Sequence, residues 1–308
     1  MKCVIMGGRG FLGSHLALAL LGRGHEVRIF DRPGSKAALP VPEQEFVGGD
    51  LANREDLIVA LAGCDTVFHL VCTTLPASSN ENPLYDVETN LVSTIRLLDV
   101  ARASGTKKIV FASSGGTVYG VPRDLPVKEE HPTDPLCSYA ISKLAIEKFL
   151  HLYSHLHGID YSVLRIANPY GEGQSPFGKQ GAIAVFTYKA LRGEPIQIWG
   201  DGEVVRDYLY VGDVADAMLK AAAYNGSHRV FNIGAGRGHS LNEILTRIEA
   251  LLGRRVERAY LPGRRLDTPV SVLDISRAQA DLRWTPETPL DAGLARTADW
   301  LTKTFDIG

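Results

Sequence analysis

The sequence predicts an α/β protein with a doubly wound parallel sheet and a smaller second lobe. Three observations lead to this fold class. Short apolar runs alternate with segments of helical periodicity, which is the pattern of parallel strands joined by crossover helices. The first run, at 2–6, leads directly into a glycine turn and an apolar-periodic helix. Polar side chains follow several runs, at the strand ends where ligands of such sheets collect.

The predicted elements alternate along the first half of the chain. The strands are short and apolar, and they cover 2–6, 26–31, 46–48, 66–70, 108–112 and 161–166. The helices lie between them, after Gly13 and at 53–61, 83–104 and 138–157. A Pro-rich loop that reaches Pro135 separates the strand at 108–112 from the last of these helices.

The turn after the first strand has the spacing of a dinucleotide site. Gly7, Gly10 and Gly13 allow a tight turn, close approach of a pyrophosphate to the backbone and close helix packing. The second strand ends in Asp31, 18 residues after Gly13, where a carboxylate can bond both adenosine ribose hydroxyls. Arg32 follows and can meet a 2'-phosphate, but Asp31 would repel that group. The pattern therefore favours NAD over NADP.

Composition argues against several classes of protein. The chain has 308 residues, 45% of them hydrophobic and 22% charged, with a formal net charge of -2. It contains no basic block and no apolar run long enough to span a membrane, so neither nucleic acid nor lipid is an expected partner. The first predicted strand begins at Lys2, which leaves no room for a signal peptide, and we expect a cytoplasmic protein.

Cysteine and histidine spacing gives no sign of a metal centre. Cys3, Cys64, Cys72 and Cys137 form no Cys-x-x-Cys pair, and we expect buried thiols rather than a metal site or disulfides. The nine histidines are scattered. No metal ion is expected.

Tyr139 and Lys143 are the candidate catalytic pair. Four-residue spacing on a helix places the phenol and the ammonium on one face. A phenol ionises at a pKa of about 10, and a neighbouring cation favours the phenolate, which would make Tyr139 a general base for a sugar hydroxyl. Asp50, Cys72, Ser114 and Asn168 lie just beyond predicted strand ends, so we expect them around the same crevice.

These motifs together resemble the extended short-chain dehydrogenase/reductase superfamily, and within it the UDP-glucose 4-epimerase-like enzymes, over essentially the whole chain. The resemblance rests on Gly7-x-x-Gly-x-x-Gly13, Asp31, Gly49-Asp50-Leu51, His69, Thr89-Asn90, the run from Ser113 to Gly120, Tyr139-x-x-x-Lys143, Leu164 to Gly171, Trp199 to Tyr208, and Arg264-x-x-Asp267.

The resemblance implies roles for individual residues. Ser114 would bond the reacting sugar oxygen, Tyr139 would be the base, and Lys143 would hold the nicotinamide ribose and lower the phenol's pKa. The other expected cofactor-binding residues are Gly7, Gly10, Phe11, Leu12, Gly13, Asp31, Arg32, Asp50, Leu51, Leu70, Val71, Cys72 and Asn90. The other expected substrate-binding residues are Thr74, Gly115, Gly116, Asn168, Gln197, Arg206, Arg264, Asp267 and Ser271.

The chain departs from the commonest family pattern in two segments. The run between Ser114 and Val118 is one residue longer, which leaves Thr117 as an alternative to Ser114 for the catalytic hydroxyl, although the spacing to Tyr139 favours Ser114. The segment 71–79, Val-Cys-Thr-Thr-Leu-Pro-Ala-Ser-Ser, replaces a different loop beside the nicotinamide and sugar. Its hydroxyl groups either shape an altered sugar pocket or form an ordinary polar loop.

The reaction implied by the resemblance is C4 epimerisation through a transient 4-keto sugar. Sugar dehydratases of the same fold resemble this chain, but they carry an Asp-Glu pair where this sequence has Gly115 and Gly116. Small Ser271 would admit an acetamido group, so we expect UDP-GlcNAc/UDP-GalNAc as well as UDP-Glc/UDP-Gal. A dTDP-6-deoxyhexose such as dTDP-L-rhamnose, a reductase or decarboxylase reaction, and an NAD-sensing regulator remain alternatives.

Two lobes are expected around the crevice. The resemblance assigns 1–168 plus about 206–235 to a Rossmann NAD-binding domain, and about 169–205 plus 236–308 to a smaller α/β lobe that binds the nucleotide sugar. The helices at 83–104 and 138–157 resemble the family's dimer bundle, so a homodimer is the expected assembly.

Overall fold

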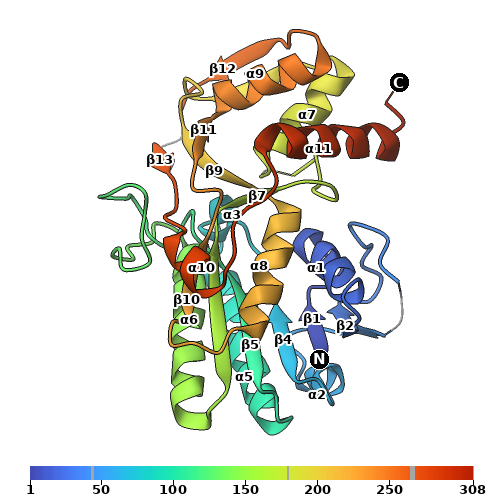
Figure 1. Cartoon of the computed structure of the whole chain (residues 1–308), viewed down its shortest axis with the longest axis vertical. Coiled ribbons are helices and arrows are strands. Elements are labelled where there is room, and N and C mark those ends of the chain that lie inside the picture. The colour runs from blue at the N-terminus through green and yellow to red at the C-terminus, as the bar shows by residue number, and fades with distance from the viewer. Residues whose placement is uncertain (43–44, 179, 264–267, 308) are drawn as a thin grey trace.

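The structure, a computed structural model, describes residues 1–42, 45–178, 180–263 and 268–307. The chain forms two parts, which lie one above the other in Figure 1. The lower part holds the N-terminus and the large sheet. The upper part holds the C-terminal helix, and the carboxyl ends of the large sheet's strands point toward it (Figure 1).

A seven-stranded parallel sheet forms the larger part, in the order β10-β6-β5-β4-β1-β2-β3. Its strands are β1 (Lys2–Met6), β2 (Glu26–Asp31), β3 (Phe46–Gly48), β4 (Thr66–His69), β5 (Lys108–Ser114), β6 (Asp160–Ile166) and β10 (Val230–Ile233). The chain runs outward from β1 through β2 and β3, then returns to β4 on the other side of β1. This reversal places a ligand crevice at the carboxyl ends of β1 and β4.

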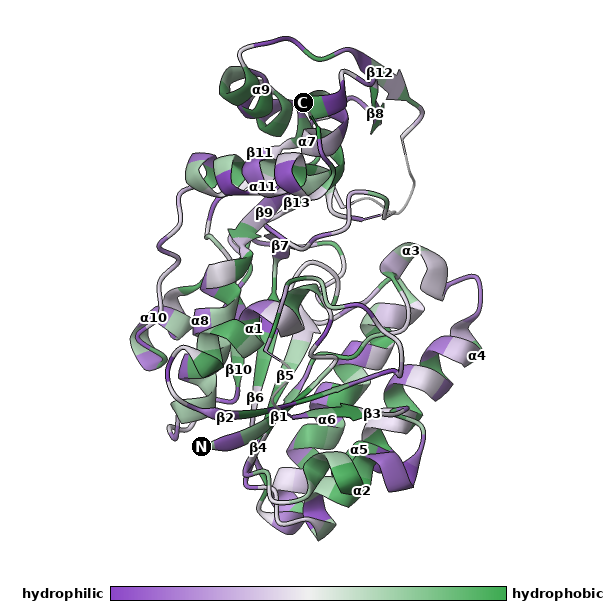
Figure 2. Cartoon of the chain, turned by 90° about the vertical axis from the view of Figure 1, so that its right-hand side faces the viewer, coloured by the Kyte–Doolittle hydropathy of each residue, from purple (hydrophilic) through white to green (hydrophobic). Residues whose placement is uncertain are grey.

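Helices cover both faces of the sheet. One face carries α1 (Phe11–Leu21) and α8 (Val211–Ala223), and the other carries α2 (Arg54–Leu61), α5 (Ser93–Ala103) and α6 (Ser138–His157). Because both faces are covered, the central strands have apolar middles, at 3–6 in β1 and 109–112 in β5, and these strands are mostly green in Figure 2. Each fully buried leucine of these helices, such as Leu16 or Leu57, contributes roughly 1.5–3 kcal/mol.

The smaller part has a separate hydrophobic core. Its sheet contains β7 (Asn168–Tyr170), β9 (Val205–Tyr210), β11 (Gly238–Ser240) and β13 (Val270–Ser271), and a second pair joins β8 (Ile196–Trp199) to β12 (Arg258–Leu261). The helices are α7 (Ala182–Arg192), α9 (Leu241–Leu252) and α11 (Leu290–Thr304). Tyr170, Phe186 and Ile244 are among the side chains that fill the space between them.

The predicted helix at 83–104 is not one continuous α-helix. The structure divides it into α4 (Pro83–Asp86), a π-helical turn η1 (Val87–Val92) and α5, and it adds a short helix α3 (Pro76–Ser79) before them. Helical periodicity alone does not reveal a π-turn, which changes the hydrogen bonding without breaking the helix. Strand ends also shift slightly, since β4 stops at His69 and β5 continues to Ser114.

The segment between β13 and α11 returns to the larger part. Helix α10 (Ser276–Asp281) contacts β10, and the fully buried Trp284 belongs to the core beneath α1 and α8. The Trp284 indole donates a hydrogen bond of 3.0 Å to the Asp213 carbonyl. Residues 276–284 therefore pack with the large sheet, whereas the sequence assigned all of 236–308 to the smaller lobe.

The exposure of the four cysteines divides them into two groups. Cys3 and Cys64 are buried in the core as free thiols, whereas Cys72 is exposed and Cys137 is partly exposed. Within the described part of the chain, no helix is both long enough and apolar enough to cross a membrane.

Candidate active site

The glycine turn after β1 forms a cradle that side chains would fill. Gly7 has φ +85, which favours glycine, and a Cβ on Gly13 would lie 2.2 Å from the Gly7 carbonyl oxygen. Gly10 caps α1, and the helix begins at Phe11 with no acidic residue in its first turn. The free N–H groups of that turn suit an anion such as a pyrophosphate. These residues fit the predicted dinucleotide.

Asp31 lies beside this cradle at the end of β2. Its carboxylate accepts hydrogen bonds from the backbone N–H groups of Arg9, at 3.0 Å, and Arg32, at 2.8 Å. The side chain of Arg32 is exposed. Arg9, which the sequence reasoning did not single out, stacks on Phe46 at 3.7 Å and donates a hydrogen bond of 2.7 Å to the Ser35 carbonyl. The sequence contained a signal for Arg9, because it is a cation placed between Gly8 and Gly10 of the turn.

The loops after β3 and β4 border the same crevice. Val71 packs beside Gly7, where an added Cβ would lie 3.3 Å from the Val71 side chain. Leu70 is half-buried and Cys72 is exposed. Asp50 uses one carboxylate oxygen to accept a hydrogen bond of 2.9 Å from its own turn, at Ala52. Leu51 is buried in the core under α2 and α5.

Tyr139 and Lys143 face each other on the first turns of α6, as predicted. The Lys143 ammonium lies 5.7 Å from the Tyr139 ring centroid and 4.7 Å from the Phe111 ring, and it donates a hydrogen bond of 2.8 Å to the Ala112 carbonyl. Ser114, at the end of β5, is hydrogen-bonded to Tyr139. The structure thus brings the three candidate catalytic side chains together.

The acidities of this pair differ from the sequence expectation. Burial raises the pKa of the Tyr139 phenol above its ordinary value, and the Ser114 hydrogen bond only partly opposes this. Burial also lowers the pKa of the Lys143 ammonium. Lys143 was expected to lower the phenol's pKa. Burial is instead the largest influence on both groups, because removal from water disfavours both charged forms.

The glycines after Ser114 are not equivalent. A Cβ on Gly115 would lie 2.8 Å from the Arg165 carbonyl and 2.5 Å from the Leu273 side chain, whereas a Cβ on Gly116 would meet nothing within 4 Å. Thr117 follows and donates a hydrogen bond of 2.8 Å to the Ser114 hydroxyl. The extra residue in this run therefore adds a second hydroxyl next to Ser114.

Two residues predicted to contact ligands instead face inward in the structure. The Thr74 hydroxyl is buried and donates to the Asp86 carboxylate. Asn90 is buried on η1, where its side chain accepts a hydrogen bond of 2.9 Å from the Thr73 backbone N–H and donates to Thr74 and Asp86. Both residues hold the loop after β4, an arrangement that sequence spacing did not reveal.

The predicted substrate residues of the smaller lobe fall into two groups. Asn168, Arg206 and Ser271 lie on β7, β9 and β13 of one sheet, and Arg206 is the register partner of Ser271. Arg206 donates a hydrogen bond of 2.6 Å to the Thr268 carbonyl. Gln197 is exposed on the separate β8–β12 pair. Arg264 and Asp267 lie outside the described residues.

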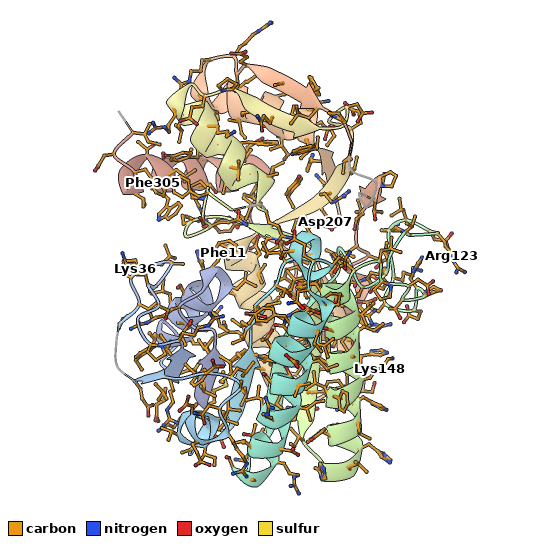
Figure 3. The ribbon with its side chains drawn as sticks, turned by 180° about the vertical axis from the view of Figure 1, so that it is seen from behind. Phe11, Lys36, Arg123, Lys148, Asp207 and Phe305 are labelled. Atoms are coloured by element: carbon orange, nitrogen blue, oxygen red, sulfur yellow. The ribbon has the colours of Figure 1, made fainter. Side chains whose placement is uncertain are left out.

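The candidate site residues lie where the two parts meet. Asn168 follows the end of β6 and donates a hydrogen bond of 3.1 Å to the Asp207 carbonyl on β9, which ties the large sheet to the small one. Figure 3 shows Phe11 and Asp207 at this level of the molecule. A ligand that spans the glycine turn, α6 and β9 would therefore contact both parts.

Comparison with known proteins shows which family this chain belongs to. The profile of the NAD dependent epimerase/dehydratase family matches residues 3–234. The chain belongs to this family. NAD is the cofactor of this family, and it suits the cradle formed by the glycine turn.

Relatives within the epimerase/dehydratase family cover nearly the whole chain. A putative UDP-glucose 4-epimerase of Methanocaldococcus jannaschii is 39% identical over 301 residues, which is 97% of each protein. A UDP-glucose 4-epimerase of Thermotoga maritima, solved with UDP-glucose, has a TM-score of 0.94 and 36% identity, covering 99% of this chain and 100% of that one. A UDP-N-acetylglucosamine 4-epimerase of Methanobrevibacter ruminantium, solved with UDP-N-acetylmuramic acid, has a TM-score of 0.93 and 29% identity, with 98% of each covered.

Proposed function

We propose that this chain is an NAD-dependent UDP-sugar 4-epimerase that interconverts UDP-Glc and UDP-Gal. The observation that carries the proposal is the meeting of Tyr139, Ser114 and Lys143 beside the dinucleotide cradle. The names of the relatives support UDP-Glc and UDP-Gal as substrates. Two proteins that align over nearly the whole chain are named as a putative UDP-glucose 4-epimerase and a UDP-glucose 4-epimerase.

The chain's own residues supply binding and proton transfer. Tyr139 takes the proton of the 4-hydroxyl as the sugar is oxidised. It returns the proton after the 4-keto sugar has rotated to present its other face. Ser114 donates a hydrogen bond to the same oxygen, and Lys143 supplies positive charge beside the phenolate. NAD would be held by the Gly7–Gly13 turn and Asp31, and it would supply reversible hydride transfer at C4 without being consumed.

Dehydration of the sugar is not supported by the residues near Ser114. Elimination of a C6 hydroxyl needs an acid and a base, and Gly115 and Gly116 provide neither. The open space beside Gly116 instead leaves room for a keto sugar to rotate. Epimerisation therefore fits this turn better than elimination does.

Acetamido sugars are included in the proposal. Ser271 is small and buried at the register position opposite Arg206 on β9. A side chain of this size leaves room for an N-acetyl group on the sugar's C2. The UDP-N-acetylglucosamine 4-epimerase among the structural neighbours supports this extension. A purified enzyme that turns over only UDP-Glc and UDP-Gal would show that the pocket is narrower than proposed.

The first experiment is NMR of the purified protein with UDP-Glc, UDP-GlcNAc or dTDP-L-rhamnose, without added cofactor. A C4-inverted product names the substrate and shows that the enzyme carries its own NAD. Stoichiometric NADH in place of an inverted sugar, seen only when NAD is supplied, would mean a dehydrogenase or decarboxylase. The Tyr139→Phe variant should lose about 10²- to 10⁴-fold in turnover and keep its NAD, whereas a non-catalytic NAD sensor would be unaffected.

We also propose a homodimer formed through α6. Ile141, Leu152 and Leu156 lie on one face of this helix and are 54%, 42% and 59% exposed, and Leu84 on α4 is 66% exposed. Light scattering of the purified protein tests this assembly. Free thiols at all four cysteines agree with the reducing interior of a cell, and we propose a cytoplasmic location.

A further inference from the structure

Asp86 is a fully buried carboxylate next to the catalytic helix. Its Oδ1 accepts hydrogen bonds from the Thr74 hydroxyl and, at 3.1 Å, from the Asn90 amide. Its Oδ2 accepts hydrogen bonds from the Ser138 hydroxyl at 2.8 Å and the Ser142 hydroxyl at 2.6 Å. Each oxygen thus has two donors, a set that suits an ionised carboxylate.

The donors to Asp86 come from three segments of the chain. Thr74 lies in the loop after β4, Asn90 lies on η1, and the two serines lie on the first turns of α6. Ser138 directly precedes Tyr139, and Ser142 directly precedes Lys143. One side chain therefore fixes the backbone on which the catalytic base and its lysine are mounted.

Asn90, on the π-turn η1, links Asp86 to the loop after β4. The Asn90 amide also donates a hydrogen bond of 3.1 Å to the Asp86 backbone carbonyl, while its oxygen accepts from the Thr73 N–H at 2.9 Å. The network therefore connects the loop that borders the sugar and nicotinamide side of the crevice to the N-terminal end of α6. That end of the helix is also where a negative charge is most favourable.

We propose that Asp86 is a positioning residue for the epimerase reaction, which holds the Tyr139–Lys143 segment of α6 against the loop at 72–75. The inference rests on the proposed function, since positioning matters only if these side chains act on a substrate. Asp86 is fully buried, and it acts on the catalytic segment through its hydrogen bonds to Ser138, Ser142 and Thr74.

The charge of Asp86 acts on both catalytic groups in the same direction. It raises the pKa of the Tyr139 phenol and the pKa of the Lys143 ammonium. Burial is the largest influence on each group. The other titratable groups that act on the pair come from the loop after β4, the residue before α6 and α6 itself: Cys72, Cys137 and Glu147. On β4, burial and then the Lys143 charge lower the pKa of His69.

The direction of the pH effect follows from these signs. Asp86→Asn removes a negative charge, so the pKa of the phenol and the pKa of the ammonium should both fall. The limb of kcat/KM against pH that follows ionisation of Tyr139 should then move to lower pH. The limb at which Lys143 loses its proton should move the same way. A role limited to stability would move neither limb.

The experiment compares the wild-type holoenzyme with Asp86→Asn and Ser142→Ala. In Asp86→Asn we expect kcat to fall about tenfold or more with little change in KM, and both limbs to move by roughly half a pH unit or more. Ser142→Ala keeps the negative charge of Asp86 and removes one of its hydrogen bonds to α6, so kcat should fall while both limbs of the pH profile stay in place. Asp99→Asn is the matched control, because Asp99 accepts a hydrogen bond of 2.7 Å from Tyr153 farther along α6. It should leave the profile unchanged.

The inference is overturned if Asp86→Asn matches wild type in kcat and in both limbs, even when its melting temperature falls. If Asp86→Asn does not fold, normal kcat in both Ser142→Ala and Thr74→Val overturns it. The tyrosinate absorbance of the holoenzyme is a readout separate from turnover, with Tyr139→Phe as the blank. A wild-type protein that inverts no nucleotide sugar refutes the proposed function, whereas an active wild-type enzyme whose kcat and phenol titration are both unchanged in Asp86→Asn refutes the inference.

Discussion

The Thr117 hydroxyl donates a hydrogen bond of 2.8 Å to the Ser114 hydroxyl, which is itself hydrogen-bonded to the Tyr139 phenol. The three groups form a chain that leads from the extra residue of the turn to the candidate base. Their order supports Ser114 as the hydroxyl that meets the sugar oxygen, with Thr117 behind it.

Removing these two hydroxyls should have unequal effects. Ser114→Ala deletes the donor next to Tyr139, and we expect kcat to fall by about 10²- to 10³-fold. Thr117→Val keeps the shape of the side chain and removes only the outer donor, so a loss of about tenfold or less is expected. Steady-state kinetics with UDP-Glc measures both. A larger loss in Thr117→Val than in Ser114→Ala would reverse the assignment.

Gly13→Ala should abolish cofactor binding. The added methyl group would lie 2.2 Å from the Gly7 carbonyl oxygen and 2.7 Å from the Gly8 Cα, so the turn must open or α1 must move. The measurement is the NAD content of the purified variant, released by denaturation. Gly24→Ala provides a comparison at the far end of α1, where an added Cβ meets nothing within 4 Å and the cost is local backbone strain at φ +74. Normal NAD content in Gly13→Ala would contradict the proposed cradle.

The buried ion pair between Arg165 and Glu147 should be costly to break from one side. The guanidinium and carboxylate lie 2.7 Å apart with side chains only 6% and 4% exposed, and Ser113 donates a further hydrogen bond to Glu147. Arg165→Met leaves a buried carboxylate without its cation, and we expect a loss of about 3–5 kcal/mol in the free energy of unfolding. The double variant Arg165→Met/Glu147→Met should be more stable than the single one. Urea unfolding measures both values, and a double variant less stable than Arg165→Met would count against this account.

Asp207 should make stability depend on pH near neutrality. Burial raises the pKa of Asp207 from 3.8 to about 6, against the opposing effect of three backbone N–H donors at Ala235, Leu273 and Gly236. The folded protein then holds this proton more tightly than the unfolded chain does. The resulting stabilisation is present below about pH 4 and is lost as the pH rises through 6.

The two pKa values of Asp207 differ by about 2 pH units, which corresponds to about 3 kcal/mol at most. Asp207→Asn cannot titrate. Urea unfolding of both proteins from pH 4 to pH 7.5 should therefore show the advantage of wild type over the variant shrinking as the pH rises. A difference that stays constant, or grows with pH, would show that the carboxyl group is not held protonated.

Sequence pattern predicted the parts of this molecule that local chemistry decides. Alternating apolar runs give the strands of the large sheet, and the Gly7–Gly13 turn and the Tyr139–Lys143 spacing each place their residues by a short-range rule. The match between the predicted helix at 138–157 and α6 has the same origin, because that helix is a single amphipathic segment that stops at Gly158.

Features that depend on distant contacts were not predictable in this way. The π-turn at Val87–Val92 places Asn90 for hydrogen bonds to Thr73 and Thr74, which lie 17 and 16 residues earlier, and its own periodicity does not indicate it. The role of the Thr74 hydroxyl depends on Asp86, a partner 12 residues away. Trp284 returns to the large sheet because its indole meets the Asp213 carbonyl, a contact across 71 residues.

The unequal surroundings of Gly115 and Gly116 limit how this enzyme can diverge. A dehydratase descendant would need acidic side chains at both positions. Position 116 can accept one without steric conflict, whereas at 115 the Arg165 backbone blocks even a Cβ. Two point mutations therefore do not suffice, because β6 must first shift relative to the turn. Substitutions at these two positions alone are therefore insufficient to change the reaction.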